Sequence, residues 1–168
     1  NGAGKTTLIR LITGLQEPTQ GRYCLYGIQN DEKDITRARR RIGAVVETPS
    51  IYGELTAVEN IKEQYRVLGL PSFEGIDDIL KLVGLENTGK KKAKNFSLGM
   101  KQRLGIADVL VKDPKVVIMD EPTLGIDPEG MRELMDLIRR LSRQIELEDI
   151  PSGEILGREF GETDLSGG

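Results

Sequence analysis

The chain has 168 residues, of which 38% are apolar and 30% charged, as expected for one globular domain with a core of its own. Its net charge of -3, aromatic content of 4% and lack of Trp argue against a nucleic acid or an anionic membrane surface as partner. No apolar run approaches the roughly 20 residues needed to span a bilayer. The single cysteine, Cys24, excludes an internal disulfide and fits a reducing compartment.

The first seven residues, Asn-Gly-Ala-Gly-Lys-Thr-Thr, read as the end of a phosphate-binding loop. A full loop reads Gly-x-x-x-x-Gly-Lys-Ser/Thr, so we expect its leading glycine and its strand to precede Asn1, and the chain to be a fragment. Backbone N–H groups at the start of a helix would hold the phosphates, Lys5 would contact the β and γ phosphates, and the Thr6 hydroxyl would bind Mg²⁺. A glycine-rich turn before a helix does not explain Gly-Lys-Thr-Thr at this place. The predicted phosphate-binding residues are Asn1, Gly2, Ala3, Gly4, Lys5, Thr6 and Thr7.

Helix signals alternate with strand signals along the chain, which predicts a parallel α/β sheet. The expected helices cover residues 5–14, 56–68, 73–83, 97–111 and 128–143, and the expected strands cover residues 21–27, 42–46 and 116–119. Thr56 and Glu59 form a possible capping box, and Ser97 and Asp127 can cap the last two helices. The basic runs 37–41 and 90–94 are expected to be a solvated helix end and a solvated loop. On the last helix the predicted core residues are Met131, Leu134, Met135, Ile138 and Leu141.

Two adjacent acids, Asp120 and Glu121, follow the apolar strand 116–119. A carboxylate at such a strand end can hold magnesium directly or through water, and the next one can accept a proton from, or orient, an attacking water. Pro122-Thr123 continues the pattern, which argues against two solvated loop acids. A phosphate loop with this strand end still allows a GTPase or a small kinase, although the guanine-reading motif Asn-Lys-x-Asp is absent.

A third segment, Phe96-Ser-Leu-Gly-Met-Lys-Gln-Arg103, places Ser97 and Gly99 at a helix N-terminus, where anions bind. Alone it would be equally well read as a capped helix. With the other two motifs it resembles the Leu-Ser-Gly-Gly-Gln signature of the ATP-binding cassette (ABC) transporter ATPases. Leu124-Gly-Ile-Asp127 resembles the D-loop of that family, and Val46-Glu47-Thr48-Pro49 resembles its Q-loop, with Glu in place of Gln. The resemblance covers about residues 1–143 and is similar in form to the bacitracin- and lantibiotic-resistance type of exporter cassette.

The resemblance implies a P-loop NTPase fold, with a parallel sheet flanked by helices and an inserted helical signature subdomain at about residues 48–112. It implies an ABC-type ATPase that binds ATP and Mg²⁺ and powers export across a membrane. It also implies a second ABC cassette as a homo- or heterodimer partner, a transmembrane permease subunit, and a cytoplasmic place at the inner face of the cell membrane. The absence of a nucleic acid partner is expected from the charge and aromatic content given above. Soluble ABC proteins of translation or DNA repair and a truncated, binding-only relic are the alternatives.

The family pattern assigns a role to each motif residue. Glu121 and Glu47 would be catalytic, and magnesium would be held by Thr6, Asp120 and Glu47. Nucleotide contacts would come from the loop residues 1–7 of one cassette and from Ser97, Gly99, Met100 and Asp127 of its partner.

The chain departs from the family pattern in two places. It contains no His, whereas the family has a switch histidine at the γ-phosphate, so hydrolysis would suffer more than binding. Its last segment, residues 144–168, ends in Leu-Ser-Gly-Gly and resembles part of a second cassette; a chance Gly-Ser-rich tail is the alternative. Five glycines in the last eighteen residues predict poor order, and no site is assigned there.

Overall fold

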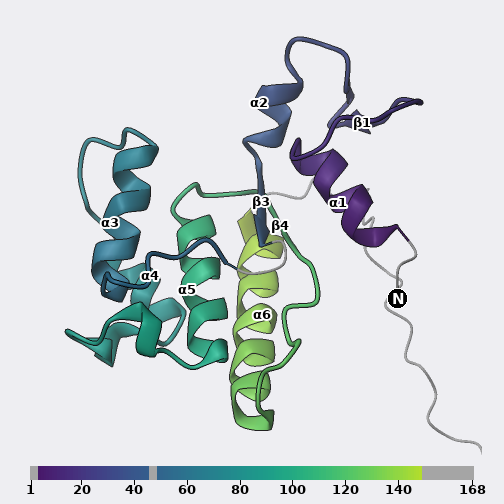
Figure 1. The fold of residues 1–168 in the computed structure, drawn as a ribbon. Coiled ribbons are helices and arrows are strands. Elements are labelled where there is room, and N and C mark those ends of the chain that lie inside the picture. Colours follow the sequence, from purple (N-terminus) through teal and green to yellow (C-terminus); the bar gives the residue numbers. More distant parts are fainter. Residues whose placement is uncertain (1–3, 46–48, 149–168) are drawn as a thin grey trace, which may run out of the picture.

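The structure, a computed structural model, describes residues 4–45 and 49–148. The helices are α1 (Lys5–Thr13), α2 (Ile35–Arg39), α3 (Ala57–Val67), α4 (Ile76–Leu82), α5 (Leu98–Leu110) and α6 (Pro128–Glu148), and the 3₁₀ turns are η1 (Glu86–Thr88) and η2 (Ala93–Asn95). The strands are β1 (Cys24–Leu25), β2 (Ile28–Gln29), β3 (Ile42–Val45) and β4 (Val116–Met119). Figure 1 shows α3, α4 and α5 together on one side, α1, α2 and β1 on the other, and β3, β4 and α6 between them.

The strands β3 and β4 form the parallel pair that the alternating pattern predicts, from Ile42 opposite Val116 to Val45 opposite Met119. The pairing continues beyond β4, where the Asp120 N–H donates to the Val45 carbonyl at 3.1 Å. An apolar run such as 116–119 is typical of a buried strand, but β4 is buried less than that pattern suggests: Val116 is 42% exposed and the remaining residues of the strand are half-buried. Within the described residues β4 has only β3 as a neighbour, so part of its surface stays open.

Local sequence signals place the helix ends well. α1 ends at Gly14, whose φ of 78° is the left-handed conformation that glycine adopts most readily. α3 begins at the predicted capping box: Thr56 Oγ1 accepts from the Glu59 N–H at 3.2 Å, and the Glu59 carboxylate accepts from the Thr56 N–H at 2.7 Å. The backbone N–H of Thr56, with Lys92 beside it, lowers the pKa of Glu59 to about 2.

The main core lies between α3, α4, α5 and α6. Its largest fully buried side chains are those of Ile61, Leu85, Leu104, Ile106, Leu134 and Leu137. The predicted core face of α6 is correct for Leu134 and Leu141, but wrong for Met131 and Met135, which are 40% and 37% exposed. The buried stripe passes through Leu137 instead, so the face of α6 that packs on the core is turned slightly from the one that the apolar pattern suggests.

Four other segments differ from the prediction. The expected strand 21–27 is the short antiparallel hairpin β1–β2, which turns at Tyr26 and Gly27, both with positive φ. The helix expected over 73–83 begins only at Ile76, after a left-handed Gly75. α6 continues to Glu148, past residue 143. The run 90–94 is partly ordered rather than a plain solvated loop, because Lys92 forms a β-bridge with Thr56 and η2 follows.

Candidate functional site

The structure brings the phosphate-loop segment to the end of β4. Thr6, in the first turn of α1, donates from its Oγ1 to Asp120 Oδ2 at 2.6 Å, although 114 residues separate the two in sequence. Both residues are half-buried. The sheet positions Asp120 through its N–H, and α1 positions Thr6, so side-chain oxygens from two separate motifs lie within hydrogen-bond distance of each other.

The N-terminus of α1 has the properties of an anion-binding end. Gly4 precedes the helix with a φ of 80°, and the Leu8 N–H donates to the Gly4 carbonyl at 2.8 Å. The N–H groups before Leu8 have no partner in the helical pattern itself, and the first turn holds no acidic side chain that would compete with an anion for the positive end of the helix dipole. Lys5 and Thr7 are exposed there. This end of α1 can therefore receive phosphate oxygens.

Glu121 follows Asp120 in a backbone conformation that is uncommon for a glutamate. Its φ is 45°, and its carbonyl accepts from the Leu124 N–H at 3.1 Å. A left-handed residue turns the chain sharply, so the exposed Glu121 leaves the strand direction beside Asp120. Strained residues of this kind are concentrated at functional sites, which supports the role predicted for Glu121.

The signature segment forms the start of α5, as predicted. Ser97 is the N-cap residue, and its Oγ accepts from the Met100 N–H at 3.2 Å. Gly99 is buried against the start of α6: a Cβ on it would lie 3.4 Å from Ile126 Cγ2 and 3.5 Å from Gly130 Cα. Asp127 is exposed and caps α6, with its Oδ2 accepting from the Gly130 N–H at 3.3 Å. The predicted residues thus form a second cluster, at the paired N-termini of α5 and α6.

Several predicted site residues lie outside the described part of the chain. They are Asn1, Gly2, Ala3 and Glu47. The tail segment 149–168 lies outside it as well.

The sequence profile of the family described as "ABC transporter" matches residues 1–124. The chain belongs to this family. A P-loop NTPase fold with a parallel sheet and flanking helices is accordingly confirmed, and so is the resemblance to bacitracin- and lantibiotic-type cassettes, by the relatives described next.

Three similar proteins support the assignment to the ABC family. The bacitracin transport ATP-binding protein BcrA of Bacillus licheniformis is 44% identical over 156 residues, which are 93% of this chain and 51% of BcrA. The lantibiotic transport ATP-binding protein SrtF of Streptococcus pyogenes is 44% identical over 138 residues, 82% of this chain and 58% of SrtF. The solved dimer of the ATP-binding cassette MJ0796 with ADP and Pi superposes with a TM-score of 0.70 at 29% identity, covering 85% of this chain and 66% of that one. The chain spans about half the length of the curated relatives it matches.

The ABC cassette's expected magnesium site is compatible with the residues present. No three His, Cys, Asp or Glu side chains gather to hold a metal anywhere in residues 4–45 and 49–148. The Thr6 hydroxyl and the Asp120 carboxylate nevertheless meet at 2.6 Å, and hard cations such as Mg²⁺ prefer oxygen ligands, usually one or two from protein together with phosphates and water. The pair fits such an ion.

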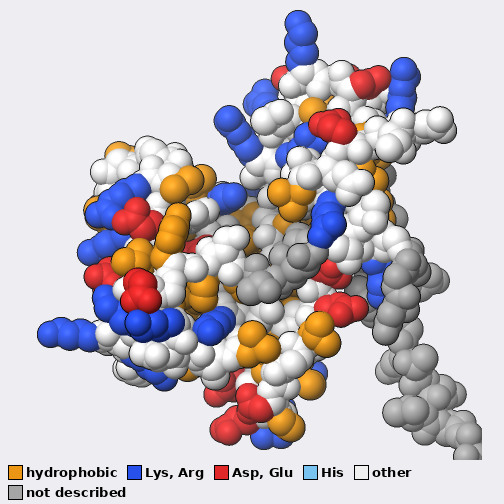
Figure 2. Space-filling view, viewed as in Figure 1, with side chains coloured by type: hydrophobic (Ala, Val, Ile, Leu, Met, Phe, Trp, Pro, Cys, Tyr) orange, Lys and Arg blue, Asp and Glu red, His pale blue; other side chains and the backbone are white. Residues whose placement is uncertain are grey.

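The surface seen in Figure 2 has no face made up of basic side chains alone. Over the α3–α4 side, Lys and Arg side chains are mixed with Asp and Glu side chains. Lys92 pairs with Glu59 and Lys94 with Glu54, which accounts for part of the basic run 90–94. The expectation that nucleic acid is not a partner stays a prediction. None of the described helices is long and apolar enough to cross a membrane.

Sequence reasoning missed three polar residues on α5: Gln102, Arg103 and Asp108. Each has one buried polar atom without a hydrogen-bond partner in the described part of the chain: Gln102 Oε1, Arg103 Nε and Asp108 Oδ1. Their places on the inner side of α5 depend on tertiary packing, so the helical pattern alone does not reveal them. The one sequence signal was the spacing of Arg103, which is four residues after Gly99 and therefore on the same side of the helix.

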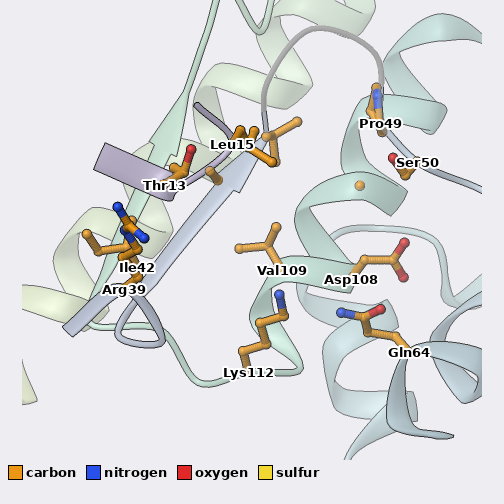
Figure 3. A pocket seen from close by; sticks show the side chains of 13 residues that line it. Thr13, Leu15, Arg39, Ile42, Pro49, Ser50, Gln64, Asp108, Val109 and Lys112 are labelled. Atoms are coloured by element: carbon orange, nitrogen blue, oxygen red, sulfur yellow. The ribbon is translucent and has the colours of Figure 1, made fainter. Parts of the chain in front are cut away.

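Asp108 borders a cavity of about 390 Å³ between β3, α5 and the end of α1. In Figure 3, Asp108 and Gln64 lie on one side of it, and Thr13, Leu15, Arg39 and Ile42 lie on the other. Burial raises the pKa of Asp108 to about 7, while Lys112, one turn further along α5, acts in the opposite direction. The carboxyl group in the folded chain therefore stays largely neutral up to about pH 7.

The free energy of unfolding of the wild-type chain should fall as pH rises, and we expect the Asp108→Asn variant to show a smaller fall. The folded-state pKa of about 7 lies above the ordinary aspartate pKa of 3.8, so the native state binds more protons between these values and stability falls as pH rises through them. The variant should be more stable than wild type at pH 8 by about 1–3 kcal/mol, and equally or less stable near pH 4. Urea unfolding at both pH values measures this. Asp136→Asn on exposed α6 is the control, and equal pH slopes for wild type and Asp108→Asn would contradict the expectation.

Proposed function

We propose that this chain is the ATP-binding part of an ABC exporter subunit, which binds ATP with Mg²⁺ and hydrolyses it when paired with a second cassette. The observation that supports this most directly is the 2.6 Å contact between Thr6 and Asp120, which joins the phosphate-loop segment to the acidic end of β4. If the segment were only an amphipathic helix with a glycine-rich start, nothing would require its first turn to contact Asp120. It is the arrangement expected where phosphate oxygens and a cation bind together.

Each described residue then has a role in the proposal. The N-terminus of α1 and Lys5 bind the phosphates, and Thr6 and Asp120 hold Mg²⁺, which when bound neutralises charge on the phosphates. Glu121 orients the attacking water and accepts its proton. Gly4 and Thr7 complete the described part of the loop. The roles of Asn1, Gly2, Ala3 and Glu47 stay predictions from sequence.

The pairing of cassettes accounts for the second cluster. The start of α5, with Ser97, Gly99 and Met100, and the neighbouring Asp127 would face the nucleotide held by the partner cassette. The MJ0796 cassette, solved as a dimer with ADP and Pi, supports such a pairing. The domain proposed to do this covers residues 1–143, with its helical subdomain at about 48–112, while no function is proposed for residues 144–168.

The remaining partner is a transmembrane permease subunit, which would hold the cassette at the inner, cytoplasmic face of the membrane. The names of BcrA and SrtF, transport ATP-binding proteins for bacitracin and for a lantibiotic, support a role in transport, which would need a membrane-spanning partner. They do not define the cargo of this chain, since one fold serves many substrates.

The test is ATP binding by the wild-type chain and by Lys5→Ala, measured by calorimetry in the presence of Mg²⁺. A charged hydrogen bond is worth about 1.5–3 kcal/mol, so we expect affinity to fall roughly ten- to a hundredfold. Lys33→Ala, at an exposed lysine outside the loop, is the control and should bind like wild type. If Lys5→Ala binds ATP with the affinity of wild type, the phosphate-loop assignment is overturned.

A further inference from the structure

Arg103 is a mostly buried arginine that connects three helices. Its side chain is only 14% exposed. Nη1 donates to the carbonyls of Val83 and Gly84 at 3.3 and 3.2 Å, at the end of α4, and Nη2 lies 3.0 Å from Glu133 Oε2 on α6. The two terminal nitrogens of one guanidinium group thus hold α5 to α4 on one side and to α6 on the other.

The fit around Arg103 is tight on the α4 side. Gly84 has a φ of 68°, and a Cβ on it would lie 2.8 Å from Arg103 Nη1. The carbonyls that Arg103 meets belong to the C-terminal end of α4, where the helix dipole is negative and carbonyls lack helical partners. Arg103 satisfies both of them, although its own Nε is buried without a partner in the described residues.

Arg103 also lies on the seam where the signature helix meets α6. At the start of this seam the contact is made by glycines, with Gly99 against Gly130 and Ile126, so the two backbones approach closely. Arg103 is four residues after Gly99 and Glu133 is three after Gly130, which places both on the same helix faces as the glycine contact. The ion pair therefore continues the glycine contact one turn further along.

The glycine contact and the buried side chains along the seam, such as Leu134, hold α5 and α6 together by apolar packing, which has no direction of its own. The Arg103–Glu133 pair adds a directional restraint, and the α4 carbonyls restrain the same guanidinium group from the other side. The N-terminus of α5 carries Ser97, and the residue before α6 is Asp127, so the register of this seam sets the distance between them.

We propose that Arg103 is a positioning residue for ATP turnover, which fixes the signature end of α5 relative to Asp127 by holding α5 between α4 and α6. The proposal rests on the proposed function, because Ser97, Gly99 and Asp127 act on nucleotide only in a paired ABC cassette. Arg103 contacts none of the phosphate-binding residues of α1, so its loss should spare nucleotide binding there and lower turnover.

The test compares Arg103→Lys, Glu133→Gln and the control Arg139→Lys in the assembled transporter. Lysine keeps the charge but replaces two separate nitrogens with one, so it cannot serve α4 and α6 in the same way. Arg139 forms a comparable ion pair with Asp136 on the exposed side of α6. We measure circular dichroism, the Kd for ATP and kcat. A misplacement of about 1 Å can cost up to about a hundredfold in rate, and we expect roughly a tenfold loss of kcat in Arg103→Lys with an unchanged Kd.

Glu133→Gln should lower kcat less, because the amide oxygen can still accept one hydrogen bond. If folded Arg103→Lys has the kcat of wild type, the proposal is overturned. It is also overturned if ATP binding and kcat both fall in proportion to the fraction of folded protein, because Arg103 would then only stabilise the fold. If Arg103→Lys does not fold, Glu133→Gln tests the proposal instead, because the half-exposed side chain of Glu133 can be replaced without disturbing the core. An unchanged kcat in Glu133→Gln overturns the proposal, and a reduced kcat with an unchanged Kd for ATP supports it. A wild-type protein that fails to bind ATP would instead overturn the proposed function itself.

Discussion

Glu121→Gln is expected to lower ATP turnover of the assembled transporter by about 10²–10⁴-fold while leaving ATP binding in place. The amide keeps the size of the side chain but cannot accept a proton from water at neutral pH. Glu121 follows Asp120 in the left-handed conformation described above, and the Thr6 hydroxyl hydrogen-bonds to Asp120 rather than relying on Glu121. Steady-state phosphate release, with the Kd for ATP measured on the same preparation, gives both quantities.

The control for Glu121 is Glu129→Gln, an exposed glutamate in the first turn of α6 on the same stretch of chain. It should turn over ATP at the wild-type rate. A Glu121→Gln variant with more than about a tenth of the wild-type rate would contradict the role of Glu121 as general base. Proton transfer would then have to be assigned to another group.

Leu134→Ala is expected to destabilise the chain by about 2–5 kcal/mol in urea unfolding. Leu134 is fully buried where α6 packs on α5, so truncation removes buried apolar area and leaves a cavity beneath the signature helix. The neighbouring Met135 is 37% exposed, and Met135→Ala on the same helix turn should cost less than about 1 kcal/mol. Similar losses for the two variants would show that α6 presents a different face to the core.

Features set by neighbouring residues could be predicted from the sequence. The capping box of Thr56 and Glu59, the left-handed Gly14 at the end of α1 and the Ser97 cap depend on contacts within four residues, and all three are present. The close approach of Thr6 and Asp120 was implied by the family resemblance, since no local rule joins residues 114 positions apart.

Features set by distant packing could not be predicted. An apolar stripe on a helix indicates the side that faces the core, but the neighbouring elements decide which of its positions are buried, so Met131 and Met135 were wrongly placed. Arg103 looks like an ordinary surface charge until α4 and α6 are placed around it. The late start of α4 follows from the left-handed Gly75, a conformation that sequence alone allows but does not require.

The parallel pairing of β3 with β4 has a consequence for the order of folding. Ile42 pairs with Val116, so about seventy residues of chain must be gathered before the first pair forms. Closing so long a loop costs entropy that only later contacts recover, whereas α3, α4 and α5 follow one another closely along the chain and can pack through short-range contacts. We expect these helices to assemble early and the two strands to join late. The meeting of Thr6 and Asp120 would then be among the last events of folding, so the nucleotide site would appear only in chains that have already passed the slow step.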